Sequence, residues 1–263
     1  MTIASLRRMS TTTLAVLAVL GLVVLSLSIS SSAWAAPTFT FKTKALPIPG
    51  FPHTGDILGA GAVIQVQGTI TGTEYGGFPP PLTGVKYWAP AGAKLHPQGF
   101  ATCAPSTIEQ RGPGPCPKTS IAGPKGSFGG VVSFGTERVH ETASVQPFFA
   151  PGGNLEFFAD GTTPVSIEIL ATGHVVSSAP PFGLEVIGEV PLIESVPGAL
   201  DASEQEGTIT VGAAYRHGKH TVSYVTVPKS CPEGGWSVKV ELSFLGGATT
   251  EASYKMPCPR RSS

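Results

Sequence analysis

Apolar and polar residues alternate with a period of two along much of this chain. In the clearest stretch, which begins at residue 236, every second residue is apolar: Trp236, Val238, Val240, Leu242 and Phe244. Side chains of a strand point alternately to the two faces of a sheet, so this pattern predicts a strand with one buried face. The 33 glycines and 25 prolines divide the chain into short pieces, and no stretch keeps a helical period over a typical helix length.

Clusters of turn-forming residues separate about ten or more strand candidates. They predict an all-β fold, an antiparallel β-sandwich with a jelly roll as one form of it. A C-terminal three-stranded meander is expected from Thr221–Val227, Trp236–Phe244 and Thr249–Met256, with its second turn at residues 245–248. Helix signals are few: Pro105–Arg111 could form a short helix, with Gly112-Pro113 as its stop signal, and Leu192–Glu206 is interrupted by Pro197-Gly198.

Residues 1–35 have the order of a secretory signal peptide. Arg7 and Arg8 precede an apolar run, Leu14–Ile29, and the small-residue pattern Ala33-Trp34-Ala35 follows it. As a helix the apolar run would span about 24 Å, which is shorter than the roughly 30 Å hydrocarbon core of a bilayer. We therefore expect cleavage after Ala35 and a secreted or cell-surface location, with a retained membrane anchor as the alternative.

The remaining residues, 36–263, are expected to form a single β-sandwich domain without a transmembrane segment. The chain has 17 basic and 17 acidic residues, and removal of residues 1–35 takes away two arginines, which leaves a net charge of −2. Because nucleic-acid-binding proteins carry a basic excess, no nucleic-acid partner is expected. Nothing in the composition indicates the oligomeric state.

The four cysteines all lie after the predicted signal peptide, as expected for an exported chain with two disulfides. Three pairings are possible. We favour Cys103–Cys116 and Cys231–Cys258, because each pair is local and brackets a turn-rich segment. A zinc site is a poor alternative, because the spacing contains no close cysteine pair.

Several cysteine-containing stretches carry a resemblance. Gly99–Cys103, Cys116–Gly123, Val227–Trp236 and Pro257–Pro259 resemble a group of exported, cysteine-stapled, β-rich proteins of high-GC Gram-positive bacteria with no known activity. The similarity extends over Phe39–Pro259. It implies export, a β-rich fold and local cysteine pairing, and it implies no catalytic residue.

The sequence contains no nucleophile elbow, phosphate-binding loop or zinc-protease motif. His217 and His220 flank Gly218-Lys219, a pattern typical of a tight hairpin turn, and no third metal ligand lies nearby. The acidic run 201–206 is interpreted as a solvated loop. We therefore expect no metal site, no cofactor and no enzymatic activity.

A secreted polysaccharide hydrolase with a loop-built carboxylate site is the alternative function. Glycoside hydrolysis requires two carboxyl groups about 5–10 Å apart. Glu137 and Glu141 would lie roughly 13 Å apart on one strand face, which is too far. Glu156 and Glu168 are the pair that neighbouring strands could bring together. Exposed strand faces are the simpler explanation for all of these glutamates, Glu141 included.

Aromatic residues supply the remaining candidate site. Tyr75 and Phe78 lie in a glycine-rich loop, and Trp88 follows Tyr87 in a strand candidate. Exposed rings of this kind stack on sugars or anchor protein partners. Adjacent strand residues face opposite ways, so one of Tyr87 and Trp88 is expected in the core, as is Trp236. The predicted function is thus non-catalytic, a binding or structural role in the extracellular envelope with a polysaccharide or another envelope protein as partner.

Overall fold

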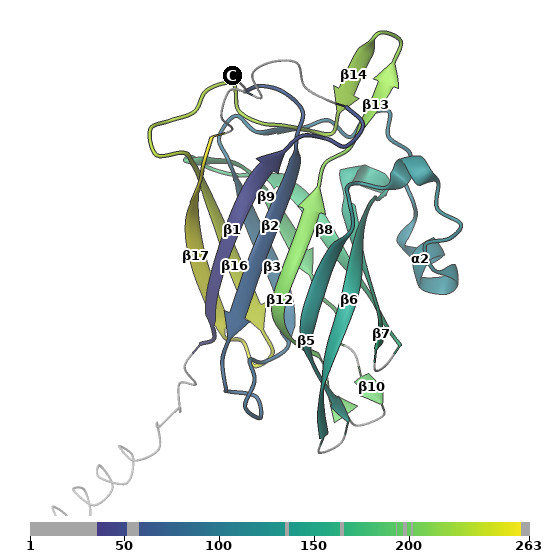
Figure 1. Cartoon of the computed structure of the whole chain (residues 1–263), viewed down its shortest axis with the longest axis vertical. Helices are drawn as coiled ribbons and strands as arrows, with labels where there is room; N and C mark the ends of the chain where they lie inside the picture. The colour runs from purple at the N-terminus through teal and green to yellow at the C-terminus, as the bar shows by residue number, and fades with distance from the viewer. Residues whose placement is uncertain are drawn as a thin grey trace, which may run out of the picture. The chain divides into compact units, whose positions relative to one another are not determined.

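One antiparallel sheet of eleven strands forms most of the described chain (Figure 1). The computed structural model describes residues 36–51, 58–134, 137–163, 166–192, 194–196, 199–200 and 202–258, and the predicted signal peptide lies outside them. In spatial order the strands are β1 (Thr38–Leu46), β2 (Val63–Thr71), β12 (Ala202–Val211), β5 (Gly126–Phe134), β6 (Glu137–Phe149), β7 (Leu155–Thr163), β8 (Ile167–Ser177), β9 (Phe182–Glu189), β3 (Leu82–Pro90), β16 (Trp236–Phe244) and β17 (Thr249–Met256). The predicted all-β, antiparallel class is confirmed.

The sheet curls until its two edge strands lie beside each other, so that it is nearly closed. The Phe41 and Tyr254 rings are 5.9 Å apart, and the Thr43 hydroxyl donates to the sulfur of Met256 at 3.8 Å. The second contact lies two residues further along both strands, so β1 and β17 run parallel here. An odd number of strands in antiparallel order requires this direction. Between these two fully described strands the structure has no backbone ladder.

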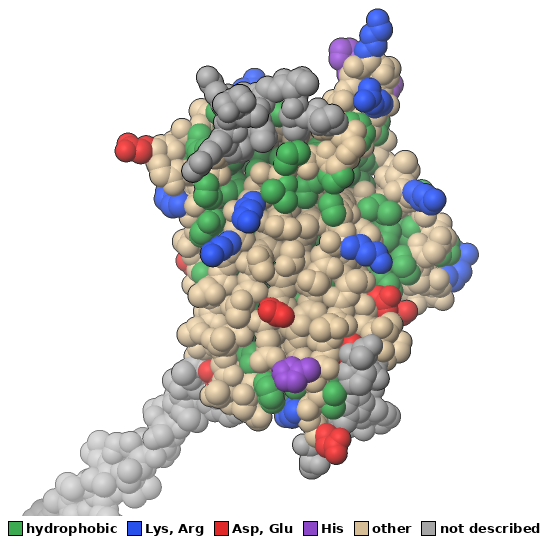
Figure 2. Space-filling model, in the orientation of Figure 1, with side chains coloured by type: hydrophobic (Ala, Val, Ile, Leu, Met, Phe, Trp, Pro, Cys, Tyr) green, Lys and Arg blue, Asp and Glu red, His purple; other side chains and the backbone are tan. Residues whose placement is uncertain are grey.

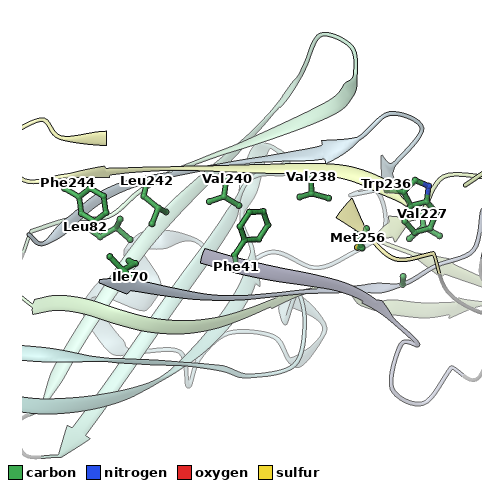
Figure 3. Packing of buried hydrophobic residues seen from close by; sticks show 11 residues of the cluster. Phe41, Ile70, Leu82, Val227, Trp236, Val238, Val240, Leu242, Phe244 and Met256 are labelled. Carbon is green, nitrogen blue, oxygen red and sulfur yellow. The ribbon is translucent and has the colours of Figure 1, made fainter. Parts of the chain in front are cut away.

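A row of large side chains fills one part of the interior (Figure 3). The apolar residues of β16 are all buried, as their alternation predicts, and they face Phe41, Ile70 and Leu82 from three other strands. Trp236 is 2% exposed, and its indole N–H donates to the carbonyl of Ser230 at 2.9 Å. Burial of each such side chain stabilises the fold by roughly 1.5–3 kcal/mol.

The predicted C-terminal meander is only half correct. β16 and β17 form the expected hairpin, but the other neighbour of β16 is β3 rather than Thr221–Val227. That segment divides at Tyr224, which is buried among aromatic rings, into β14 (His220–Ser223) and β15 (Val225–Thr226). The two pieces pair with β13 (Ala214–His217) and β4 (Lys94–Leu95).

The β13–β14 hairpin extends from one end of the sheet (Figure 1). His217 pairs with His220 across a turn in which Gly218 has a positive φ of 61°, so the predicted hairpin turn is confirmed. The remaining short elements are η1 (Lys118–Ser120), η2 (Pro151–Gly153), β10 (Glu194–Val196) and β11 (Ala199–Leu200).

A single α-helix among the described residues, α2 (Pro105–Arg111), covers part of the outer face of the sheet. Pro105 begins it with a preset φ, and Gly112 ends it at a φ of 67°, as the sequence predicts. Ile108 is its one buried residue and packs with Phe148 of β6 and Phe158 of β7.

Both predicted cysteine pairs are present. Cys103 and Cys116 are bonded across the segment that contains α2, with their Cα atoms 5.4 Å apart. Cys231 and Cys258 are bonded with Cα atoms 6.2 Å apart, and they join the open end of the β16–β17 hairpin. The described residues include no helix long and apolar enough to cross a membrane.

Candidate functional site: an apolar cavity inside the sheet

A cavity of about 290 Å³ lies inside the nearly closed sheet. Its walls are the inward-facing residues of the strands, and nearly all of them are apolar. On four adjacent strands several of these residues have small or absent side chains: Ala143, Ala159, Ala171 and Gly188. Protein interiors are normally packed as densely as organic crystals, so small residues grouped on one wall leave space. No local pattern in the sequence marks this cavity, because it forms only where the strands lie side by side.

Tyr224 lies at one end of the cavity. Its side chain is 1% exposed and packs against Phe149 and Phe100, with ring centroids 4.6 Å and 5.9 Å away. The backbone is held on both sides, because its N–H donates to Ala213 and its carbonyl accepts from His96, each at 2.8 Å. Yet the hydroxyl has no hydrogen-bond partner among the described residues. Burial raises the pKa of Tyr224 to about 12, so the phenol remains a hydrogen-bond donor at neutral pH.

A second tyrosine in the cavity wall does have a partner. Tyr87 of β3 faces inward, and its hydroxyl shares a hydrogen bond with the buried hydroxyl of Thr43. Burial raises its pKa to about 12 as well, and the hydrogen bond with Thr43 partly opposes that shift. The two tyrosines therefore form a natural comparison between a satisfied and an unsatisfied hydroxyl.

Three glutamates, Glu141, Glu204 and Glu206, lie in the cavity wall away from Tyr224. Glu141 of β6 and Glu204 of β12 both pair with Gly130 of β5, one from each side. Neighbouring strands are about 4.8 Å apart, so the two Cα atoms are about 10 Å apart across the glycine. Glu204 accepts the backbone N–H of Leu82 at 3.0 Å. Glu141 is buried, and its carboxylate lies over Gly161, where an added Cβ would come within 2.8 Å of it.

The sequence interpretation of both glutamates was wrong. Glu141 was expected on an exposed strand face, and Glu204 in a solvated loop. The structure places Ala202–Val211 in β12, where the register shifts between Glu204 and Glu206. This irregularity interrupts the two-residue alternation by which a strand is recognised.

The two polar ends of the cavity are far apart. Glu141 and Phe149, the ring that packs on Tyr224, are eight residues apart on β6. At about 3.4 Å per residue the separation is about 27 Å. Between them the inward positions of β6 are apolar, among them Ala143 and Val145. The cavity is therefore long, apolar along its length and polar at both ends.

The carboxylate pair suggested for a hydrolase does not form. Glu156 pairs with Thr172, whereas Glu168 pairs with Asp160, so the two glutamates are about 13 Å apart along the strands. Glu156 lies on the outer face and is 1% exposed. One carboxylate oxygen accepts the hydroxyl of Thr172 at 2.9 Å, and the other has no partner among the described residues. Burial raises the pKa of Glu156, and Glu109 of α2 adds to the shift.

The aromatic residues proposed as a binding surface do not lie together. Tyr75 and Phe78 close a turn between β2 and β3 through two backbone hydrogen bonds, and Arg138 lies 5.6 Å from the Tyr75 ring. Trp88 is on the outer face of β3, about 20 Å along the strand from its first residue. The ammonium of Lys239 lies 3.9 Å from its ring centroid. Tyr87 and Trp88 face opposite ways as predicted, and a binding role for the three rings stays a prediction.

Charged side chains are scattered over the face shown in Figure 2 rather than gathered in one patch. Over the part of the chain that the structure describes, no group of three or more His, Cys, Asp or Glu residues is arranged to hold a metal ion. No family model matches the sequence, and no curated protein or solved structure is significantly similar to it.

Proposed function

We propose that this protein is an exported, non-catalytic binding protein that encloses an elongated apolar small molecule inside its nearly closed sheet. The observation that carries the proposal is the apolar cavity of about 290 Å³. An apolar cavity of about 150 Å³ in another protein stays free of water and binds benzene. A larger cavity lined in the same way is suited to a larger apolar ligand. The partner expected from sequence, a polysaccharide or an envelope protein, stays a prediction, and the cavity adds an apolar ligand to it.

The small residues of the wall support a binding role. Ala143, Ala159 and Ala171 occupy inward positions where β16 carries Val, Leu, Phe and Trp. Replacing a large apolar residue by alanine at a buried position costs about 2–5 kcal/mol of stability. If stability alone determined these positions, large apolar residues would be expected there. An extracellular location agrees with the two disulfides, which persist in oxidising compartments.

The β-sandwich expected from sequence and a container differ in whether the walls meet across the interior. In a sandwich the two inner faces interdigitate to form one continuous core. Here we infer the container form, because the packed clusters around β16 and around Tyr224 do not fill the interior and leave the cavity beside β6 to β9.

The test is to measure ligand binding and its dependence on cavity volume. The protein, produced by export so that its disulfides form, is titrated with the neutral fluorophore N-phenyl-1-naphthylamine, whose emission rises in apolar surroundings. We expect saturable binding. The variant Ala171→Phe fills the cavity from β8 and is expected to weaken binding at least tenfold, and Ala143→Leu serves as a milder second filling variant.

The matched control is Val176→Phe, which adds a ring to the same strand at an outward position that is 41% exposed. It should bind the fluorophore as the unmodified protein does. Absence of saturable binding in the folded protein, or equal binding by all these variants, would overturn the proposal.

A further inference from the structure

The cavity contains one buried hydroxyl that no described protein group satisfies. Leaving a buried hydroxyl without a partner costs about 1–3 kcal/mol. The Tyr224 ring packs against both Phe149 and Phe100, and its backbone is held by two hydrogen bonds, so the hydroxyl cannot simply turn to solvent. Because Tyr224 lines the cavity, a molecule inside the cavity is placed to supply the missing partner.

We propose that the enclosed ligand is an uncharged, elongated lipid with one oxygen function, such as a long-chain alcohol or ketone, and that Tyr224 donates a hydrogen bond to that oxygen. This inference rests on the proposed function. It adds the chemical class of the ligand and names the residue that recognises its polar end.

The surroundings of Tyr224 decide the charge of the ligand's polar end. A carboxylate there would lie among apolar residues of the cavity wall that pack with Tyr224, namely Leu95, Leu155 and Val225, and would receive one donor. Burying an ionised group with so little compensation is costly, whereas a neutral oxygen needs only one hydrogen bond. At the far end of the cavity the acidic side chains of Glu141 and Glu204 disfavour the carboxylate of a ligand bound the other way round. A fatty acid is therefore a poorer ligand than the corresponding alcohol.

The test compares ligands that share a chain and differ only in the head group. Decane, decan-1-ol and decanoate are each used to displace N-phenyl-1-naphthylamine from the intact protein. We expect decan-1-ol to bind about fivefold or more tightly than either of the others, in line with one net hydrogen bond. Tyr224→Phe should remove the advantage of the alcohol over decane and leave decane unchanged.

Tyr254→Phe is the matched control, because it removes a phenol hydroxyl from a ring of β17 that packs on Phe41 and is not among the described residues of the cavity wall. It should leave the preference for decan-1-ol intact. Tighter binding of decanoate, or an alcohol preference unaffected by Tyr224→Phe, would overturn this inference while fluorophore and decane binding still supported the proposed function. Failure of every probe to bind would overturn both.

Discussion

The hydroxyl groups of Tyr87 and Tyr224 are both buried, but they contribute differently to stability. A hydrogen-bonded hydroxyl contributes about 0.5–1.5 kcal/mol net to the free energy of unfolding. An unsatisfied hydroxyl has lost its hydrogen bonds to water and gained none in the protein. We expect Tyr87→Phe to lower the free energy of unfolding by about 1 kcal/mol, and Tyr224→Phe to leave it unchanged or raise it. Urea denaturation of ligand-free protein measures both. An equal loss in the two variants would show that the Tyr224 hydroxyl is already satisfied.

The carboxyl group of Glu156 makes stability depend on pH. Burial raises its pKa above the ordinary value of 4.5, so the folded state holds this proton more tightly than the unfolded state. Below pH 4.5 both states are protonated and the carboxyl group costs least. As the pH rises through 4.5 the unfolded state ionises first, and stability is lost until the folded carboxyl group ionises as well.

We therefore expect Glu156→Gln to match the unmodified protein at low pH and to become the more stable of the two as the pH rises past 4.5. The comparison is the midpoint of urea unfolding measured from pH 3.5 to pH 7. Glu168→Gln, an exposed residue on the neighbouring strand, is the control and should show no such divergence. Parallel profiles for Glu156→Gln and the unmodified protein would contradict the raised pKa.

At the scale of elements, α2 is a short helix attached to the outer face of the sheet chiefly through Ile108, together with the Cys103–Cys116 disulfide. A helix this short is not stable alone in water, so its packing decides whether it stays ordered. Ile108→Ala should lower the free energy of unfolding by about 2–4 kcal/mol.

The measurement is chemical denaturation, with Gln110→Ala as the control, because Gln110 is exposed on the same helix. That control should change stability by less than about 0.5 kcal/mol. Equal losses of stability in the two variants would contradict the proposal that burial of Ile108 holds α2 on the sheet.

Local signals in the sequence predict individual elements well. β16 follows from its alternation, and α2 from Pro105 and Gly112. The turn at Gly218 likewise follows from the residues around it. What the sequence does not predict is which strands become neighbours. Thr221–Val227 has the pattern of one strand, but Tyr224 divides it, because its ring packs against the rings of Phe149 and Phe100. Both phenylalanines are more than seventy positions away in the sequence.

The candidate site shows the same limit more strongly. Ala143, Ala171 and Gly188 are unremarkable one at a time, and only the register of β6 to β9 brings them to one wall. Glu141 and Glu204 are more than sixty positions apart in the sequence, and they lie on either side of Gly130, which belongs to the strand between them. No local pattern encodes such a pairing. The aromatic residues that the sequence singled out are placed elsewhere.

For the whole molecule, the region where β1 and β17 meet is where the sheet is weakest. The two strands contact through side chains such as Phe41 and Tyr254, without a backbone ladder. A strand paired on one side only leaves every second amide without a sheet partner. The Cys231–Cys258 disulfide holds β17 at its end and on the chain-entropy model adds about 3.5 kcal/mol to the stability of the whole.

Hydrogen exchange resolved by residue tests this weak region. In β17, amides that face β16 should be protected, and the alternate amides that face β1 should exchange at least tenfold faster, because only the first set is hydrogen-bonded. β6 is the internal control: it is paired on both sides by β5 and β7, so protection should not alternate over the stretch where both pairings exist. Uniform protection along Thr249–Met256 would mean that a ladder joins β1 to β17 in solution and that the sheet is fully closed. A ligand enclosed in the cavity should then leave by an end of the sheet rather than between these strands.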